Sequence, residues 1–585
     1  MIDQSRREFL RSTAGAGLGL AGLPAFADAA AASGAGATDH VAVKAVDVHA
    51  AVDRAIGVLV ANGFDDFFPR SAAIDLLAGD PAVKEELSFD TAAFLGGGAS
   101  VRSPYPATKV AWPKGDRYEH RYCTLLEPRD ATAYLTVAVC IAHAMEPWRV
   151  PLSDNRIFSY RFSPDARSFL FDPHYTASAF RAETVARLTA ERRTYLVRTD
   201  IESFYPQIVH DRLKSILAAC NVEKYHVNAL IRLLQGWQDA DGRGIPIGPD
   251  ASNILAEAAL IEVDRDLLAA NVSFIRYVDD YRLFAPDQAT AQSWLDLLRR
   301  RLADERLTLN ANKTEIHAVT RSEYEAWWVQ RNLGLLSAGR ELVQDSPPQP
   351  RYGSRRPPKA RDDDSGARKW ITKGSHKWTA LEDFLLQLRL SNRPDLKDIR
   401  IGLEAGYRHG AFPLLEKFIG LIDRSPNVLP YVADLLIQES GGIPEDSRRR
   451  IAELLGKRLN SREAMMDYEV VGIAGILAAA PYRNTHAIAE FLRSDRFRDL
   501  SPTLTQFVLA ALDTDIDEDG RAFLEARFAA ADPSERWAIA RLLLPVMSHD
   551  RRSAFMAREQ ARADSDAFLE TIFASYGNNS GAITS

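Results

Sequence analysis

Apolar and polar positions follow two different patterns along the chain, one before about residue 340 and one after residue 378. In the first part, apolar residues at helical spacing alternate with short apolar runs. The helical spacing predicts helices over residues 46–62, 131–145 and 289–305. The short runs predict strands over residues 194–199, 273–277 and 281–284. Helices interleaved with strands indicate a mixed α and β domain over residues 41–340.

Residues 378–575 carry a helical pattern throughout. Apolar residues recur at i, i+3, i+4 and i+7, and short breaks of Pro, Asn, Asp or Ser separate the segments. The clearest segments are LEDFLLQLRL, FPLLEKFIGLIDR, NVLPYVADLLIQ, RRRIAELLGKRL and ERWAIARLLLPVM. Antiparallel helix pairs stacked into a curved array would bury these faces, although no strict sequence period is present. The predicted fold class is α+β, with an all-α, helical-repeat-like domain over residues 378–585.

The segment between these two parts has a different composition. Residues 344–377 hold five Pro, nine Lys or Arg and four acidic residues. This composition predicts a basic, Pro-rich linker over residues 341–377. The linker is either a solvated tether or a flexible arm that binds a polyanion.

The first thirty residues resemble an export signal. Residues 5–11 match the twin-arginine pattern, residues 14–23 are weakly apolar, and residues 25–27 provide an A-x-A cleavage context. A flexible basic leader, or translation from a start codon assigned too far upstream, is the alternative. The Gly, Ala and Ser content predicts that residues 1–40 are disordered while they remain attached.

The overall composition restricts the classes of function. Lys and Arg number 72 against 79 Asp and Glu, a formal charge of −7, so any nucleic-acid-binding surface must be local. Three Cys without a CxxC pair are too few for a disulfide framework and argue against a structural zinc site. No apolar run reaches the ~18 residues that span a bilayer, so we expect no membrane span.

Two segments of the first part carry candidate chemistry of different kinds. Asp200 follows a short apolar strand, where an acid is rigidly held yet accessible, which suits a metal ligand. A turn or helix-capping residue is the alternative. The loop at 244–252 is rich in Gly and Pro, so its backbone can approach a flat partner, and a helix of small residues follows at 253–260. The alternative is a plain loop with Ser252 as the helix N-cap.

Asp279 and Asp280 lie at the tip of a predicted hairpin over residues 274–284. Adjacent ionised carboxylates repel one another unless a cation neutralises them, so the pair indicates a cation site. A solvated Asp-Asp turn is the alternative for this segment taken alone. Together, an acid after a strand, a Gly/Pro loop with a helix, and a hairpin with paired acids follow the order of a polymerase palm.

In this order the motifs resemble those of reverse transcriptases. The resembling segments are DIESFY at 200–205 for motif A, residues 244–252 for motif B, YVDD at 277–280 for motif C, and LTLNANKT at 307–314 for motif D. Upstream, residues 112–130 resemble the fingers motifs. The resemblance covers about residues 60–320. It implies the palm and fingers of a right-hand polymerase over residues 41–340.

The resemblance also implies an RNA-directed DNA polymerase that transfers nucleotides with two Mg²⁺ ions, or with Mn²⁺ in their place. Its partners would be dNTPs, an RNA template and a DNA product. It implies metal ligation by Asp200, the Ile201 carbonyl, Asp279 and Asp280. For Lys313 it implies proton donation to the leaving pyrophosphate, with a plain surface cation as the alternative.

The remaining site residues are implied to contact the substrate. Lys114 and Arg121 fall where the family binds the incoming triphosphate, with a solvated surface cation as the alternative for each. Gly248 and Ser252 belong to the motif B loop. Tyr205 falls at the sugar-gate position, where a bulky ring clashes with a ribose 2′-hydroxyl and favours dNTPs. A core aromatic is the alternative for Tyr205.

A palm followed by a long helical region resembles bacterial reverse transcriptases of the abortive-infection and defence-associated type. Residues 157–162, IFSYRF, also resemble the segment before motif A in that group. This resemblance implies a role against phage and leaves untemplated or protein-primed synthesis open. An enzyme that needs dNTPs would be cytoplasmic, with periplasmic export through residues 5–27 as the alternative. An oligomer or a protein partner would form through the helical domain.

Three other interpretations stay open at this point. An RNA-dependent RNA polymerase shares the palm, but it usually carries Gly-Asp-Asp at the hairpin, and both Tyr277 and Tyr205 count against it. A catalytically inactive palm could bind nucleic acid alone, although all three expected acids are present. The helical array could also dock a partner or the product strand, which would complement catalysis.

Overall fold

The computed structural model describes twelve stretches of the chain. They are residues 47–64, 72–79, 81–96, 102–113, 120–164, 169–190, 192–237, 241–332, 372–391, 394–512, 516–564 and 566–577. The predicted leader at 1–40 and residues 341–371 of the predicted linker lie outside these stretches. In the described part of the chain, no helix is both long enough and apolar enough to cross a bilayer.

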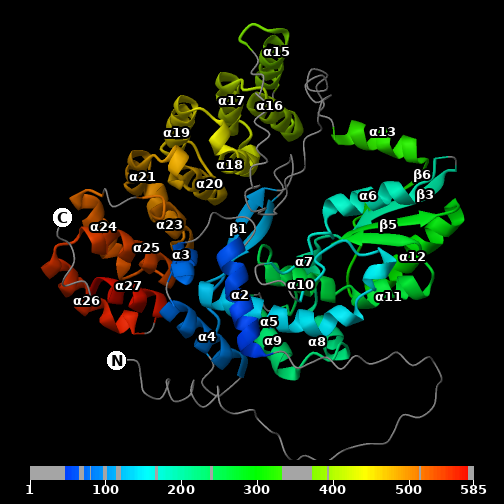
Figure 1. Ribbon diagram of the computed structural model, residues 1–585, viewed down its shortest axis with the longest axis horizontal. Helices are drawn as coiled ribbons and strands as arrows, with labels where there is room; N and C mark the ends of the chain where they lie inside the picture. Colours follow the sequence, from blue (N-terminus) through cyan, green and yellow to red (C-terminus); the bar gives the residue numbers. More distant parts are fainter. Residues whose placement is uncertain are drawn as a thin grey trace, which may run out of the picture. The chain divides into compact units, whose positions relative to one another are not determined.

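A four-stranded antiparallel sheet forms the centre of the first part (Figure 1). Its strands are, in spatial order, β4 (Phe274–Tyr277), β5 (Asp280–Ala285), β3 (Thr194–Asp200) and β6 (Glu315–Val319). Side chains along a strand alternate between the two faces of a sheet, so both faces must find cover. The three strands expected from the apolar runs are confirmed, each to within one residue at either end.

Helices cover both faces of this sheet (Figure 1). On one face, Leu196, Ile275 and Phe284 form an apolar cluster with Phe180 of α6 (Ala177–Arg187) and Tyr324 of α13 (Arg321–Asn332). On the other face, α11 (Ile261–Ala269) and α12 (Gln288–Asp304) pack against the main core. The sheet therefore packs against helices on both of its faces.

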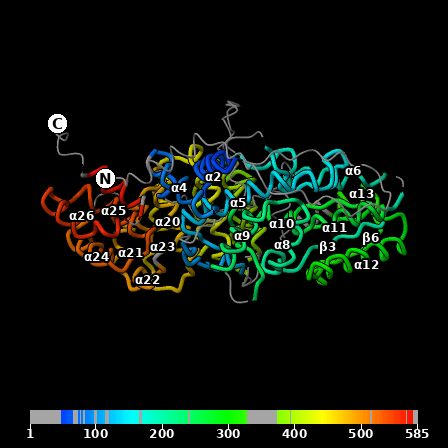
Figure 2. The backbone as a smooth tube through the Cα atoms, turned by 90° about the horizontal axis from the view of Figure 1, so that it is seen from below, coloured from blue at the N-terminus to red at the C-terminus, as the bar shows by residue number. Residues whose placement is uncertain are grey.

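A buried helix, α5 (Pro128–Met145), organises the layer of helices beside the sheet. Every residue of α5 except His143 is buried, as expected for a helix with neighbours on all sides. It contacts α2 (Val48–Asn62), α4 (Pro81–Gly96), α9 (Lys224–Trp237) and α10 (Asp250–Ala258), which surround it in both views (Figures 1 and 2). The predicted helices over 46–62, 131–145 and 289–305 are confirmed, with ends that differ by up to three residues.

A two-stranded hairpin precedes α5. Strands β1 (Thr108–Pro113) and β2 (His120–Leu125) pair antiparallel, with Thr108 opposite Leu125 and Trp112 opposite Arg121. The backbone N–H of Thr124 in β2 donates to the carbonyl of Ile247 at 2.8 Å. The hairpin is therefore tied to the Gly/Pro loop expected to belong to motif B.

The described chain after residue 372 is helical, as the apolar spacing predicts. Its α-helices are α15 (His376–Leu390), α16 (Leu396–Arg408), α17 (Phe412–Ile419), α18 (Leu429–Gln438), α19 (Glu445–Leu459), α20 (Asp467–Ala478), α21 (Thr485–Leu492), α22 (Asp495–Asp499), α23 (Pro502–Leu509), α24 (Glu518–Phe528), α25 (Pro533–Leu543), α26 (His549–Ala563) and α27 (Ala567–Gly577). Each helix packs mainly against helices close to it in sequence, as in a stacked array. The predicted α+β fold class, with its helical C-terminal region, is confirmed.

Polar and aromatic contacts join the helical region to the first part of the chain. The hydroxyls of Thr108 and Thr503 lie 2.8 Å apart, and the rings of Trp112 and Tyr468 have centroids 5.8 Å apart. Nη2 of Arg129 lies 4.0 Å from Oδ1 of Asp566. The helical region thus packs on the β1–β2 hairpin and on the start of α5.

Candidate active site

The two acidic segments meet at one end of the sheet. Strand β3 ends at Asp200, and the register of β3 with β5 places Asp200 directly opposite Asp280. The backbone N–H of Ile201 donates to the carbonyl of Asp279 at 3.1 Å. Because residues opposite one another in an antiparallel pair point to the same face, Asp200 and Asp280 share a face of the sheet. The expected hairpin over 274–284 is confirmed, with Val278 and Asp279 forming its turn.

The electrostatics of this end are set by three neighbouring carboxylates, of which Asp279 and Asp280 have raised pKa values. Burial, followed by the nearby carboxylate of Asp200, raises the pKa of Asp279 to about 6. Burial also raises the pKa of Asp280, although Arg282 and Arg198 oppose the shift. Nη2 of Arg282 lies 3.6 Å from Oδ2 of Asp280. These carboxyl groups therefore ionise reluctantly in the absence of a cation.

Lys313 lies beside Asp200, where it supplies part of the missing positive charge. Residues 308–310 run alongside the end of β3, because Glu202 N–H donates to Thr308 O and Asn310 N–H donates to Asp200 O, both at 2.8 Å. The short 3₁₀ turn Ala311–Lys313 then directs the lysine back, with Nζ 2.5 Å from Oδ2 of Asp200. About half of the Lys313 side chain is exposed. The motif D segment thus reaches the site expected from the sequence.

The donor chemistry of this site suits a hard divalent cation. Such ions prefer carboxylate oxygens, and among the described residues the buried Oδ1 of Asp200 has no hydrogen-bond partner. In the described chain, however, no group of three or more His, Cys, Asp or Glu side chains is arranged to hold a metal ion. Oδ2 of Asp200 is instead paired with Lys313. The buried Ile201 follows Asp200 and forms a bridge with Leu309, so its ligand role stays a prediction.

Tyr205 lies between the motif A and motif B segments. It belongs to the one-turn helix α7 (Phe204–Gln207), and its hydroxyl donates to Oδ1 of Asn253 in α10 at 2.7 Å. Its carbonyl accepts the N–H of Ile245 at 3.0 Å. Tyr205 is only partly buried, so its ring is not a fully enclosed core aromatic.

The motif B loop is held in a conformation that requires glycine. Gly248 has φ +125° and Gly244 has φ +91°, a region that side chains with a Cβ rarely adopt. The helix that follows starts earlier than expected, at Asp250, and its N-cap is Pro249 rather than Ser252. Ser252 is fully buried, and its hydroxyl lies 2.9 Å from that of Tyr134. Its side chain is therefore engaged inside the protein.

The two cations expected to meet a triphosphate are only partly covered by the structure. Arg121 lies in β2, opposite Trp112, and its side chain is partly buried. Lys114 lies outside the described residues. Substrate contact by both residues stays a prediction.

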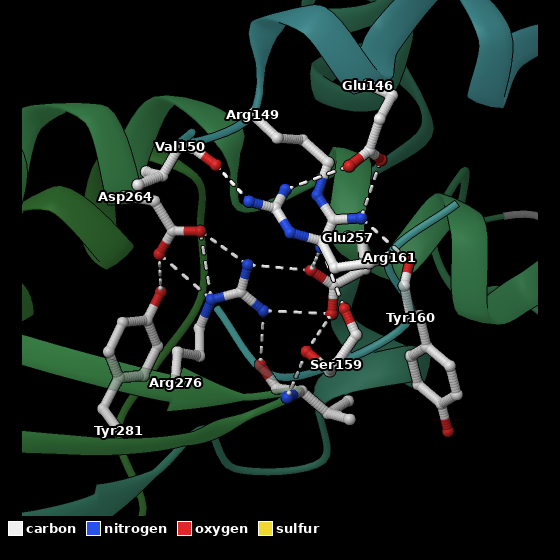
Figure 3. Close-up of polar contacts among 11 residues, drawn as sticks. Glu146, Arg149, Val150, Ser159, Tyr160, Arg161, Glu257, Asp264, Arg276 and Tyr281 are labelled. Carbon is white, nitrogen blue, oxygen red and sulfur yellow. Dashed lines mark hydrogen bonds and ion pairs between the residues drawn. The ribbon is translucent and has the colours of Figure 1, made fainter. Parts of the chain in front are cut away.

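Sequence reasoning missed a buried ionic cluster directly behind the acidic turn (Figure 3). We call it the Arg276 cluster; its members are Glu146, Arg149, Ser159, Arg161, Glu257, Asp264, Arg276 and Tyr281. Arg276 contacts Oδ2 of Asp264 at 2.5 Å and Oε2 of Glu257 at 2.9 Å. Nη2 of Arg149 contacts the same Glu257 carboxylate at 2.6 Å. The signal in the sequence was weak: single charges inside otherwise apolar segments, such as Arg276 in Phe-Ile-Arg-Tyr.

A family comparison identifies this region of the chain. Residues 147–341 match the family model described as reverse transcriptase (RNA-dependent DNA polymerase). The chain contains a reverse transcriptase domain. The domain is that of a nucleotidyltransferase of the RNA-directed DNA polymerase class. The match includes all four palm segments predicted from the sequence, and it begins after the β1–β2 hairpin and α5.

The comparisons with curated proteins and with solved structures add little to this assignment. None of the curated proteins compared with the chain matches it. Among solved structures, the chain is similar to a telomerase from Candida albicans in complex with a TWJ fragment of telomeric RNA, at 14% sequence identity and a TM-score of 0.28. That match covers 62% of this chain and 64% of the telomerase chain, less than two thirds of its length. Reverse transcriptase domains generally use divalent metal ions and bind nucleic acid templates and products.

Proposed function

We propose that this protein is an RNA-directed DNA polymerase that adds dNTPs to a DNA strand by two-metal nucleotidyl transfer. One observation carries the proposal. Within the reverse transcriptase domain, the pairing of β3 with β5 and the Ile201–Asp279 hydrogen bond bring Asp200, Asp279 and Asp280 to one end of the sheet. This convergence joins residues almost eighty positions apart into one acidic site.

Asp200, Asp279 and Asp280 would hold two Mg²⁺ ions, or Mn²⁺ in their place. When bound, the ions neutralise charge on the transferring phosphate and on the attacking and leaving oxygens. The aspartates supply oxygen ligands on a rigid strand end and a tight turn. Lys313 is close enough to Asp200 to hold a proton beside the site, which supports its proposed role as proton donor to the leaving pyrophosphate.

The substrate contacts are proposed from the same arrangement. Tyr205 would select against a ribose 2′-hydroxyl, with its ring fixed by the hydrogen bond to Asn253. Gly248 would allow the motif B backbone to approach the nucleotide, and Ser252 would support that loop from the core. Lys114 and Arg121 would meet the triphosphate.

The finer biological role rests on the resemblance of the whole arrangement to defence-associated bacterial reverse transcriptases. A role against phage is proposed because a long helical region follows the palm. A cytoplasmic location is proposed because dNTPs are needed, and cell fractionation with N-terminal sequencing tests it. A protein partner or an oligomer would bind through helices α15–α27.

A primer-extension assay tests the activity. The full chain is incubated with Mg²⁺, dTTP and oligo(dT) annealed to poly(rA), and also with dNTPs alone. We expect templated DNA synthesis that Asp279→Asn/Asp280→Asn abolishes, a fall of at least ~10³-fold. Asp296→Asn is the matched control, because Asp296 is an exposed residue of α12 that pairs with its helix neighbour Arg299.

The outcomes separate the alternatives. If DNA is made without a template, the activity is untemplated or protein-primed synthesis on the same fold, and not templated copying. Normal synthesis by the double variant, or no synthesis by the wild-type chain under any condition, would contradict the proposed function. If the wild-type chain makes no DNA but binds nucleic acid, the domain is a catalytically inactive palm that binds nucleic acid.

A further inference from the structure

The turn that carries Asp279 contains a residue in a disfavoured backbone conformation. Val278 has φ +56°, in the left-handed region. A β-branched side chain rarely adopts this region, because its Cβ atom crowds the following carbonyl oxygen. Val278 immediately precedes Asp279, so any relaxation of its backbone would re-aim the Asp279 carboxylate.

Both polar backbone groups of Val278 are held by the Arg276 cluster. The N–H of Val278 donates to Oγ of Ser159 at 2.9 Å. The carbonyl of Val278 accepts from Nη1 of Arg276 at 2.9 Å. The side chains of Ser159 and Arg276, which lie far from each other in the sequence, therefore hold Val278 from both sides.

These two side chains are themselves fixed by Glu257. Oγ of Ser159 donates to Oε1 of Glu257 at 2.5 Å, and both terminal nitrogens of Arg276 contact the Glu257 carboxylate at 2.9 and 3.1 Å. Ser159 and Glu257 are fully buried, and Arg276 is 1% exposed. A buried, fully paired network of this kind has one low-energy arrangement, since any movement would leave a charge without a partner.

The charges of the cluster balance. Arg149, Arg161 and Arg276 face Glu146, Glu257 and Asp264, so the group is neutral despite its burial. Burial acts to raise the pKa of Glu257, but the guanidinium groups of Arg276 and Arg149 outweigh burial and lower that pKa. Asp264 is further fixed by the hydroxyl of Tyr281 at 3.0 Å.

We propose that Ser159, Glu257 and Arg276 are positioning residues that hold Val278 in its left-handed conformation and thereby aim Asp279 at the catalytic metal ions. Among the contacts described for the cluster, those to the turn go to the backbone of Val278 and not to the side chains of Asp200, Asp279 or Asp280, so the cluster acts through the backbone. This inference rests on the proposed function, because it concerns the metal-binding geometry of that same site.

Ser159→Ala is the sharpest test, because it removes one hydrogen bond to the turn and leaves every charge of the cluster in place. Mn²⁺ affinity of the nucleotide-free protein is measured by electron paramagnetic resonance, beside kcat and the dNTP KM. We expect Mn²⁺ affinity to fall roughly five-fold and kcat roughly ten-fold, with little change in KM. Ser447→Ala is the control, since Ser447 is a buried serine of α19 bonded to Arg450.

A second variant tests the backbone strain directly. Glycine adopts positive φ without a Cβ penalty, so Val278→Gly in the Ser159→Ala background should recover part of the lost Mn²⁺ affinity. No recovery, or unchanged Mn²⁺ affinity and kcat in Ser159→Ala, would overturn the proposal. The proposal would also be overturned if Ser447→Ala lost as much Mn²⁺ affinity and kcat as Ser159→Ala at an equal drop in melting temperature.

Failure of the proposed function gives a different result. If the wild-type chain binds no Mn²⁺, or if Asp279→Asn/Asp280→Asn still synthesises DNA, the metal-dependent activity and this inference are both wrong. If the wild-type chain binds Mn²⁺ and the double variant is inactive, equal behaviour of Ser159→Ala and wild type would remove the positioning role alone.

Discussion

At the scale of single residues, Asp279 carries the least favourable charge at the end of the sheet. Its pKa is raised to about 6 by burial and by the carboxylate of Asp200, whereas its ordinary value is 3.8. The folded protein therefore binds this proton more tightly than the unfolded chain does. Ionisation of Asp279 consequently costs stability when no cation is present. A site that is unfavourable when empty is one that a cation stabilises.

The sign of this effect gives a pH-dependent prediction. In EDTA, the wild-type protein should lose stability as the pH rises from about 4 to about 6, and carry the full penalty above that. Asp279→Asn should therefore be more stable than wild type at pH 8, by about 1–2 kcal/mol because solvent screens part of the repulsion at this half-buried group. The gain should shrink toward pH 4. Urea unfolding across this range measures it, with Asp296→Asn as the control; a gain that is constant with pH would contradict it.

A second residue-scale prediction concerns the nucleotide sugar. Tyr205→Ala removes the ring, so incorporation of rNTPs relative to dNTPs should rise by about 10–100-fold. Tyr205→Phe keeps the ring and removes the hydroxyl that bonds Asn253, so its discrimination should stay near that of wild type. Competing dTTP and UTP on the same primer measures both ratios. Equal discrimination by all three proteins would show that Tyr205 is not the sugar gate.

At the scale of elements, the helical region depends on close approach between neighbouring helices. Gly402 of α16 faces Phe418 of α17, and a Cβ at position 402 would lie 2.2 Å from the Phe418 ring. The absence of a side chain is what lets these two helices meet. In the sheet, the pairing of β3 with β5 sets the register that brings Asp200 opposite Asp280.

Gly402→Ala should therefore destabilise the protein by about 1–3 kcal/mol, because the added methyl group forces Phe418 from its place. Thermal unfolding measures the loss. Gly79→Ala at the end of α3 (Ala72–Gly79) is the matched control, since a Cβ there meets nothing within 4 Å. A Gly402→Ala protein as stable as Gly79→Ala would mean that α16 and α17 do not pack as described.

At the scale of the whole molecule, the helical region and the start of α5 share a buried polar contact. Asp566 accepts the indole N–H of Trp537 at 2.9 Å and the backbone N–H of Phe568 at 3.1 Å, and it also faces Arg129 of α5. One carboxylate thus joins two helices of the C-terminal region to the part of the chain before the reverse transcriptase match. We therefore predict that this contact couples the stability of the two parts.

Asp566→Ala should lower the free energy of unfolding by about 2–4 kcal/mol, because it leaves the buried indole N–H of Trp537 without its acceptor and removes the carboxylate that faces the buried Arg129 guanidinium. Hydrogen–deuterium exchange should accelerate both in α27 and in the first turn of α5. Asp446→Ala, at an exposed position of α19, should change neither. Faster exchange confined to α27 would show that the two parts unfold independently.

The sequence by itself predicted the elements and the chemistry that depend on neighbouring residues. Strand β3 ending in Asp200, the hairpin carrying Asp279 and Asp280, and the amphipathic helices of the second part follow from local periodicity and turn composition. Periodicity states which face of an element is buried. It does not state which distant element covers that face. The helix predicted to start at residue 253 therefore starts at Asp250 in the structure, as α10.

Only the tertiary structure decided the partners. Arg149 and Glu257 are 108 positions apart, and Lys313 and Asp200 are 113 apart, yet each pair is in direct contact. A buried charge is tolerated only where folding brings an opposite charge to it, and no local pattern records that meeting. For the same reason, the sequence predicted Asp279 as a metal ligand, whereas the residues that contact its turn became visible only in the folded chain.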